Sequence, residues 1–112
     1  MQIKVRGSGT VPIVDVLGRL TIGEPSEQLH QALEELLKTG TRHVIVDLNG
    51  VPQIDSSGIS ALVRMSIKLT REGGALRLVC RPGRVRDALT VTRLVEAIPT
   101  FDNETAALAN FS

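Results

Sequence analysis

The sequence predicts an α/β fold: a mixed, mostly parallel sheet of four to five strands, with a leading antiparallel hairpin, β-α repeats and about four helices packed mainly on one face. Two patterns indicate this fold. Short apolar runs alternate with amphipathic stretches along the 112 residues, and turns rich in glycine or proline separate them. Hydrophobic residues make up 42% of the chain and charged residues 22%, which is typical of a single globular domain over residues 1–112.

The first two elements form the expected hairpin. Residues 2–6 alternate polar and apolar side chains, as a strand with one buried face does. Residues 11–17 predict a second strand, and the short turn at residues 7–9 makes the pair antiparallel. Because Pro12 cannot donate a ladder hydrogen bond, we expect it near the start of a strand or on an edge.

An amphipathic helix is expected next, with Pro25 in its first turn and its end at about Lys38. Its apolar face is formed by Leu29, Ala32, Leu33, Leu36 and Leu37. Gly40 fits the position just beyond the helix end. Residues 44–48 then form a near-continuous apolar run, which is typical of a parallel strand covered by helices.

The second half of the chain repeats this alternation. A turn at residues 49–52 leads to a second helix that runs to Arg71, where Gly73 and Gly74 stop it. The remaining expected elements are a strand at 75–80, a helix around 85–92, a short edge strand at 97–101 and a last helix that begins at Asp102 or Asn103 and runs to about residue 111.

Composition and motifs argue against several functional classes. The net charge is only +1 and aromatic residues are 2% of the chain, so we expect no direct nucleic-acid binding. His30 and His43 lack metal-ligand spacing, no phosphate-binding loop or hydrolase elbow occurs, and Cys80 is most simply a small buried hydrophobe. We therefore expect no enzyme activity, no metal and no cofactor.

The same features predict where the protein resides. A single cysteine excludes an internal disulfide. No apolar run approaches the roughly 18 residues of a membrane span, and the N-terminal residues lack the apolar region of a signal peptide. We expect a soluble cytoplasmic protein without membrane insertion.

Basic residues are concentrated in one segment. Residues 64–93 carry eight basic and two acidic side chains. The simpler interpretation is a set of solvated helix faces, and the functional one is a local basic surface for an anionic or acidic partner. A small-molecule or nucleotide module built on this segment ranks last, because no phosphate loop accompanies it.

The most distinctive segment is Ile54-Asp55-Ser56-Ser57-Gly58-Ile59, at the expected start of the second helix. Asp and Ser there are explained by capping of the first-turn N–H groups. However, a cap needs one residue, and three polar residues precede a glycine that costs a helix roughly 1 kcal/mol. The glycine gives access to the neighbouring backbone. A serine at this position is also a favourable place for a phosphate, which would meet the helix dipole and unpaired N–H groups.

The sequence resembles the STAS domains, and specifically the anti-sigma factor antagonists. The resemblance rests on Asp47-Leu48, Val51 and the segment 54–59, and further on Gly18-x-Leu20, Gly73-Gly74 and the region of Leu94. It extends over essentially the whole chain, and it implies a STAS-type fold.

The resemblance also implies a partner-switching function. The unphosphorylated antagonist binds an anti-sigma factor, a serine kinase of the histidine-kinase-like ATPase fold, and so releases a sigma factor. The kinase phosphorylates the second serine of the motif, here Ser57, and a phosphoserine phosphatase reverses this. Asp55 and Ser56 would shape the acceptor loop, and Gly58 and Ile59 would open the helix against which the partner docks.

One loop departs from the family pattern. Where family members often read Gly-Glu-Leu-Asp, this sequence has Gly18-Arg19-Leu20-Thr21, so Arg19 and Thr21 replace two carboxylates among the expected partner-binding residues. The alternative function is a STAS scaffold or accessory subunit, in a stress-signalling or lipid-transport complex, without a phosphorylation cycle.

Overall fold

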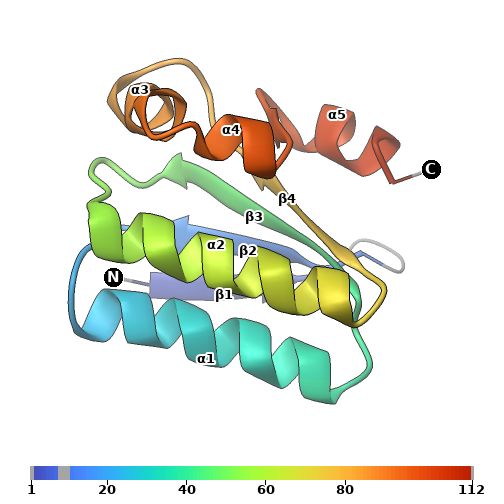
Figure 1. The fold of residues 1–112 in the computed structure, drawn as a ribbon. Coiled ribbons are helices and arrows are strands. Elements are labelled where there is room, and N and C mark those ends of the chain that lie inside the picture. Colours follow the sequence, from blue (N-terminus) through green and yellow to red (C-terminus); the bar gives the residue numbers. More distant parts are fainter. Residues whose placement is uncertain (1, 8–10, 112) are drawn as a thin grey trace.

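The computed structural model describes residues 2–7 and 11–111. Within these residues the sheet has five strands, and their order β1-β2-β3-β4-β5 follows the chain (Figure 1). β1 is antiparallel to β2, and the other neighbouring pairs are parallel. This confirms the predicted α/β fold with a mixed, mostly parallel sheet. The strands are β1 (Gln2–Arg6), β2 (Ile13–Leu17), β3 (His43–Gly50), β4 (Ala75–Val79) and β5 (Thr100–Phe101).

Five helices occur in the described part of the chain, one more than the sequence predicted. They are α1 (Glu24–Lys38), α2 (Ser56–Arg71), α3 (Arg84–Val91), α4 (Leu94–Ala97) and α5 (Glu104–Ala109). The additional helix is α4. It is separated from α3 by Arg93, whose φ of 62° interrupts the helical backbone. None of the helices among these residues is both long and apolar enough to cross a membrane.

The helices divide unequally between the two faces of the sheet. Buried side chains of α1 to α4 pack with the inward-facing side chains of the strands in one main core, whereas α5 lies against the opposite face (Figure 1). The strand contribution to the main core comes from alternate residues, among them Val14, Val16, Val44, Val46, Leu76 and Leu78. A fully buried side chain of this size contributes about 1.5–3 kcal/mol, so the main core fixes the positions of α1 and α2. The prediction of helices mainly on one face is confirmed.

Several predicted boundaries differ from the observed ones. β3 continues to Gly50, through the start of the turn expected at 49–52, because Leu17 of β2 still pairs with it. The edge strand covers only two of the five residues expected at 97–101, since α4 occupies the preceding turn. β2 begins directly after Pro12, as expected for a residue without an N–H group. The predicted turn at 7–9 lies mostly outside the described residues.

A charged cluster joins the sheet to α5 on the second face. Arg6 of β1 forms ion pairs with the carboxylates of Asp15 and Glu104. Carboxylate oxygens of Asp15, Asp47 and Glu104 all lie within 4.8 Å of one another. Partial burial, reinforced by a hydrogen bond to Glu104, raises the pKa of Asp47 to about 6. Below about pH 6 a protonated Asp47 is able to donate to the Glu104 carboxylate, whereas at higher pH the two negative charges repel each other and weaken the contact between α5 and the sheet.

The raised pKa of Asp47 predicts how stability changes with pH. The folded protein holds this proton more tightly than the unfolded chain, so the contribution of Asp47 to stability is greatest near pH 4 and is lost as pH rises through about 6. In Asp47→Asn the side-chain oxygen still accepts from the Asn49 N–H, now 2.9 Å from Asp47 Oδ1, and the amide donates to Glu104. We expect the variant to exceed wild type by about 1–2 kcal/mol in free energy of unfolding at pH 7.5, and by much less at pH 4.5.

Urea unfolding of both proteins between pH 4.5 and 8 measures this difference. Asp87→Asn, which neutralises an exposed carboxylate on α3, is the matched control and should leave the pH dependence of wild type unchanged. A pH-independent difference between Asp47→Asn and wild type would contradict the proton-sharing interpretation.

Candidate functional site

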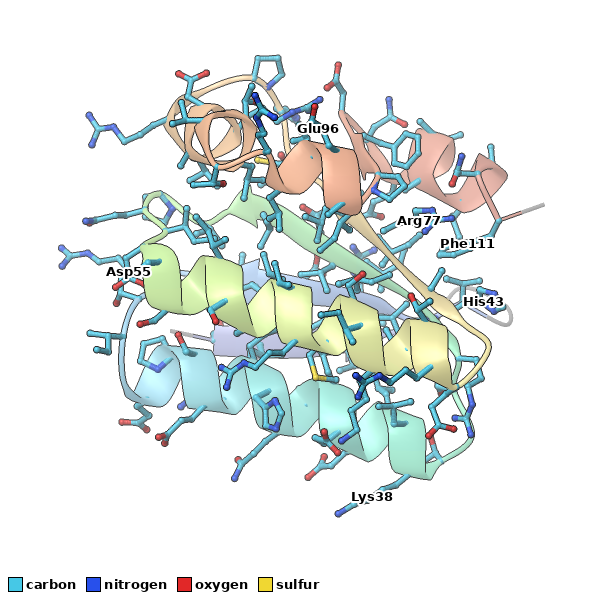
Figure 2. The ribbon with its side chains drawn as sticks, viewed as in Figure 1. Lys38, His43, Asp55, Arg77, Glu96 and Phe111 are labelled. Atoms are coloured by element: carbon cyan, nitrogen blue, oxygen red, sulfur yellow. The ribbon has the colours of Figure 1, made fainter. Side chains whose placement is uncertain are left out.

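The Asp55 carboxylate organises the start of α2 (Figure 2). Its Oδ1 accepts hydrogen bonds from the N–H groups of Ser57, at 2.9 Å, and Gly58, at 3.1 Å. Its Oδ2 accepts from the N–H of Ile22, at 2.9 Å, in the loop that follows β2. Desolvation tends to raise the pKa of Asp55, but these three hydrogen bonds outweigh it and lower the pKa below its usual range. One ionised side chain therefore caps α2 and fixes the neighbouring loop.

This cap corrects one expectation from the sequence. The prediction that the polar segment caps the helix is confirmed, with Asp55 as the N-cap residue. The N–H groups of Ser57 and Gly58 are already paired with its carboxylate, and the N–H of Ile59 bonds to the Asp55 carbonyl at 3.0 Å. The expectation that a phosphate here would meet unpaired N–H groups is therefore wrong for these three donors.

Glycine is required at position 58 because a side chain there would collide with neighbouring atoms, and not because a partner needs access to the backbone. It is buried, and a Cβ atom at this position would lie 2.5 Å from the Leu20 carbonyl oxygen and 2.9 Å from Ile54 Cγ1. Leu20 forms an isolated parallel bridge with Ile54, and its N–H donates to the carbonyl of Gln53 at 2.9 Å. The β2–α1 loop thus lies directly against the first turn of α2. The interpretation that Gly58 leaves its backbone open to a partner is wrong.

Ser57 lies in a shallow hollow between the N-terminal halves of α1 and α2. The hollow has a volume of about 590 Å³ and is lined by Gly23, Ser26, Glu27, Ser56, Ser57, Ser60 and Arg64. Ser56 is exposed and Ser57 is half-buried. Within the described residues, neither serine hydroxyl makes a hydrogen bond, so both oxygens are free to react or to contact a partner.

The structure brings most of the predicted site residues to one end of the sheet. Asp55, Ser56 and Ser57 lie together, as described above. Arg19 is exposed on the β2–α1 loop, and in the same loop the Thr21 carbonyl accepts from Ser26 Oγ at 2.8 Å. Ile59 points inward and packs against the main core, so its side chain is mostly unavailable to a partner.

Sequence reasoning missed one residue of this surface. Ile22 follows Thr21 in the β2–α1 loop, and 76% of its surface is exposed although its backbone N–H is fixed by Asp55. A single exposed apolar side chain is common on protein surfaces, so the interest of Ile22 lies in its place beside Asp55 and Ser57 and not in its exposure alone. The available signal was an isoleucine in a loop just before Gly23, outside any helix or strand pattern.

The basic segment does not form one surface. Half of its eight cations are engaged locally: for example, Lys68 pairs with Glu34 of α1, and Arg86 lies 3.2 Å from Asp102. Arg77, on the face of the sheet that carries α5, stacks over the ring of Phe111 at 4.9 Å (Figure 2). The simpler interpretation, solvated side chains on separate elements, agrees with this arrangement, and a single basic patch does not.

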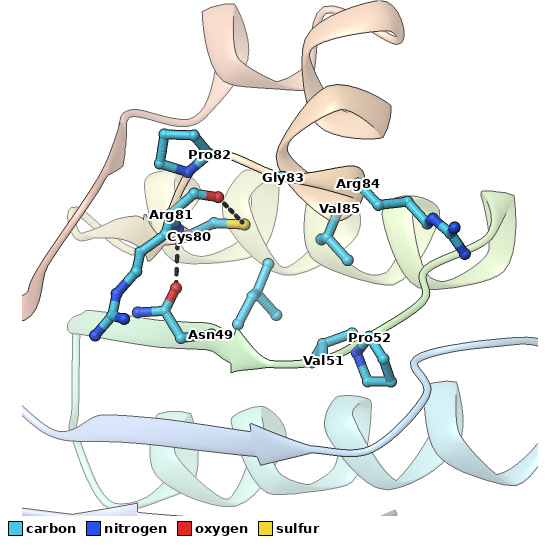
Figure 3. Close-up of a pocket in the computed structure, with 10 residues that line it drawn as sticks. Asn49, Val51, Pro52, Cys80, Arg81, Pro82, Gly83, Arg84 and Val85 are labelled. Carbon is cyan, nitrogen blue, oxygen red and sulfur yellow. Dashed lines mark hydrogen bonds between the residues drawn. The ribbon is translucent and has the colours of Figure 1, made fainter.

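A second hollow, of about 230 Å³, lies between the ends of β3 and β4 (Figure 3). Asn49 Oδ1 accepts from the Arg81 N–H at 2.8 Å and holds the two strand ends together. Cys80 is 3% exposed, and burial raises the pKa of its thiol. A thiol in this state is a poor nucleophile, which agrees with the prediction of a small buried hydrophobe.

Comparison with known proteins identifies the class of protein. A family model for the STAS domain matches residues 2–107, so the chain belongs to the STAS domain family. No curated protein sequence was found to match it.

Several solved structures share the fold. An anti-sigma factor antagonist from Mycobacterium paratuberculosis is 24% identical, with a TM-score of 0.84 over 97% of this chain and 92% of the other. A candidate anti-sigma factor antagonist from Thermotoga maritima is 22% identical, with a TM-score of 0.88 over 96% and 92%. The Bacillus cell fate determinant SpoIIAA, in its phosphorylated form, is 15% identical, with a TM-score of 0.74 over 99% and 100%.

The packing at Gly58 predicts the effect of a methyl group there. Replacing glycine by alanine in a helix normally stabilises it by about 1 kcal/mol. In Gly58→Ala the new Cβ would overlap the backbone of Leu20, so we expect a loss of about 2–3 kcal/mol instead. Urea unfolding measures the change, with Ser60→Ala, an exposed substitution on the same helix, as the control. A stabilised Gly58→Ala would contradict the packing assignment.

Proposed function

We propose that this STAS domain is an anti-sigma factor antagonist that binds its anti-sigma factor while Ser57 is unmodified and is released when Ser57 is phosphorylated. The observation that carries the proposal is the Ser57 hydroxyl, which lies in a surface hollow without a hydrogen-bond partner among the described residues, on a helix start fixed by Asp55. The names of the structurally similar proteins support the class, and the phosphorylated SpoIIAA structure supports the modification.

The proposed partners are those that the family resemblance implies. The anti-sigma factor is a serine kinase of the histidine-kinase-like ATPase fold. In the modification step Ser57 Oγ forms a bond to the γ-phosphorus of ATP, the bond to the departing ADP oxygen breaks, and the hydroxyl proton passes to a base of the kinase. A phosphoserine phosphatase hydrolyses the ester and restores the hydroxyl. The protein is the substrate of both enzymes and requires no cofactor of its own.

Ser57 rather than Ser56 is the proposed acceptor. The family motif assigns the acceptor to the second serine, and the local geometry supports the choice. The backbone of Ser57 is held by the hydrogen bond from its N–H to Asp55, which fixes its Cβ atom at the edge of the hollow and leaves the hydroxyl free to turn toward a partner. Ser56 is more exposed, and its N–H makes no bond to the Asp55 carboxylate.

The surface around Ser57 is the proposed docking site for the anti-sigma factor. It combines the exposed Ile22, the hydroxyls of Ser56 and Ser57, and the polar side chains of Arg19 and Thr21. A phosphate at Ser57 places about two negative charges at the centre of this surface. Desolvating that charge in a complex costs several kcal/mol, and about 3 kcal/mol weakens binding more than a hundredfold.

Phosphate transfer is the first test. The purified protein is incubated with ATP and each histidine-kinase-like anti-sigma factor of the source organism, and the modified residue is mapped by mass spectrometry. We expect phosphate on Ser57 in wild type and in Ser56→Ala, and none in Ser57→Ala. Binding without any phosphate transfer would support the alternative, a STAS scaffold without a phosphorylation cycle. Phosphate on Ser56 alone would overturn the assignment.

Substitutions at Ser57 test the switch itself. We expect Ser57→Ala to bind the anti-sigma factor as wild type does, and Ser57→Asp to bind at least tenfold more weakly, since one carboxylate only partly reproduces a phosphate. Calorimetric titration measures the affinities. Thermal melting checks the fold, which should be nearly unchanged because Asp55 already binds the first-turn N–H groups of Ser57 and Gly58. Equal affinities for all three proteins would mean that this surface is not the switch.

A further inference from the structure

We propose that Arg64 is the internal receptor for a phosphate on Ser57, so that phosphorylation neutralises a cation next to the docking surface, in the hollow that Ser57 lines, while it adds a dianion. The inference rests on the proposed phosphorylation of Ser57 and extends it to what the phosphate binds. Three features of the hollow between α1 and α2 lead to it: its occupied backbone donors, its negative charges and the position of Arg64.

A phosphate on Ser57 finds most of the backbone donors of the helix start already paired, with the N–H of Ser56 as the exception among the four first-turn groups within the described part of the chain. Asp55 Oδ1 holds the N–H groups of Ser57 and Gly58, at 2.9 and 3.1 Å. The Asp55 carboxylate is itself ionised, because its hydrogen bonds lower its pKa. The new dianion would therefore lie beside an existing negative charge, and it needs a compensating donor from elsewhere.

The other groups that line the hollow increase the need for a cation close to the phosphate. From α1 the carboxylate of Glu27 lines the same hollow, and His30 lines a hollow that shares Ser26, Glu27 and Arg64 with it. The remaining polar groups that line the hollow are the hydroxyls of Ser26, Ser56 and Ser60. Among the side chains that line the hollow with Ser57, Arg64 is the permanent cation.

Arg64 is placed to reach Ser57. The two residues are seven positions apart on α2, which puts them on the same helix face and about 10.5 Å apart along the axis. Long side chains of a helix lean toward its N-terminus, so the guanidinium of Arg64 is able to extend toward Ser60 and Ser57, with which it lines one hollow. An extended arginine and a phosphoserine together span this separation, and both residues line the same hollow.

Arg64 is also free to move to the phosphate. The next cation along this face of α2, Lys68, is paired with Glu34 of α1. Within the described residues Arg64 makes no ion pair and no side-chain hydrogen bond, and it is exposed. A guanidinium binds phosphate oxygens through two parallel N–H groups, which a lysine ammonium does not reproduce.

The contact gives the switch two simultaneous effects. In the unmodified protein Arg64 is available to a carboxylate of the anti-sigma factor beside the Ser57 hydroxyl. In the phosphorylated protein the same guanidinium is turned inward to the phosphate, so the partner meets a dianion and loses a cation. The partner that fits this surface carries an acidic side chain opposite Arg64.

The contact is measurable without any partner. Phosphoserine is installed at position 57 during expression, and ³¹P NMR titration gives the second pKa of the phosphate, which is about 6 when unperturbed. We expect this pKa to be lower by about one unit in otherwise wild-type protein than in Arg64→Met, because a nearby cation favours the dianion. Arg64→Lys should recover part of the shift.

The controls separate this contact from general effects. Arg71→Met removes another exposed cation of α2, two turns further along the helix, and should leave the phosphate pKa as in wild type. Equal pKa values in wild type and Arg64→Met, with amide NMR spectra of a folded protein, would overturn the proposal. That result would leave Ser57 as the kinase acceptor, whereas absence of kinase transfer would refute the proposed function without changing the measured contact.

Discussion

The candidate site depends on the close contact between the β2–α1 loop and the first turn of α2. Two features maintain it: the lack of a side chain at Gly58, which lets the Leu20 carbonyl approach, and the Asp55 carboxylate, which binds N–H groups on both sides of the contact. Backbone hydrogen bonds between Leu20 and residues 53 and 55 add to these two features, so loss of either feature would weaken the contact. The position of Ile22 and the orientation of Ser57 follow from this contact, because each is hydrogen-bonded to Asp55 through its backbone.

The two faces of the sheet serve different purposes. The main core holds α1 and α2 firmly, and a binding surface built on such elements is well defined because it needs little ordering when a partner arrives. The opposite face carries only a small apolar cluster beneath α5, together with the carboxyl groups of Asp15, Asp47 and Glu104. Stability therefore responds to pH near 6 at a face remote from Ser57, whereas the cap at Asp55 is lost only in more acidic solution, because its hydrogen bonds lower the pKa of that carboxyl group.

The sequence predicted the elements whose signals are local. The leucine periodicity of α1, the glycines that end α1 and α2 and the apolar run of β3 specify those elements directly. It did not predict the break at Arg93, because a left-handed residue other than glycine has no compositional signal. The polar cap at Asp55 was predictable, but its bond to Ile22, 33 residues away, was not, since that bond depends on how the loop and helix pack. Because the contact between Gly58 and the β2–α1 loop also depends on this packing, the sequence did not indicate that glycine is required there to avoid a collision with Leu20.

The agreement between strand order and chain order has a consequence for synthesis on the ribosome. Each strand pairs with strands next to it in sequence, so each new β-α unit can add to a strand that has already emerged. Local pairing of this kind lowers the entropic cost of closing each loop. The contacts of α5 are less local, and the ion pair between Arg6 and Glu104 joins residues 98 positions apart. Because α5 follows all five strands in the chain, this ion pair needs the C-terminal residues, and the earlier strands are able to pair without it during synthesis.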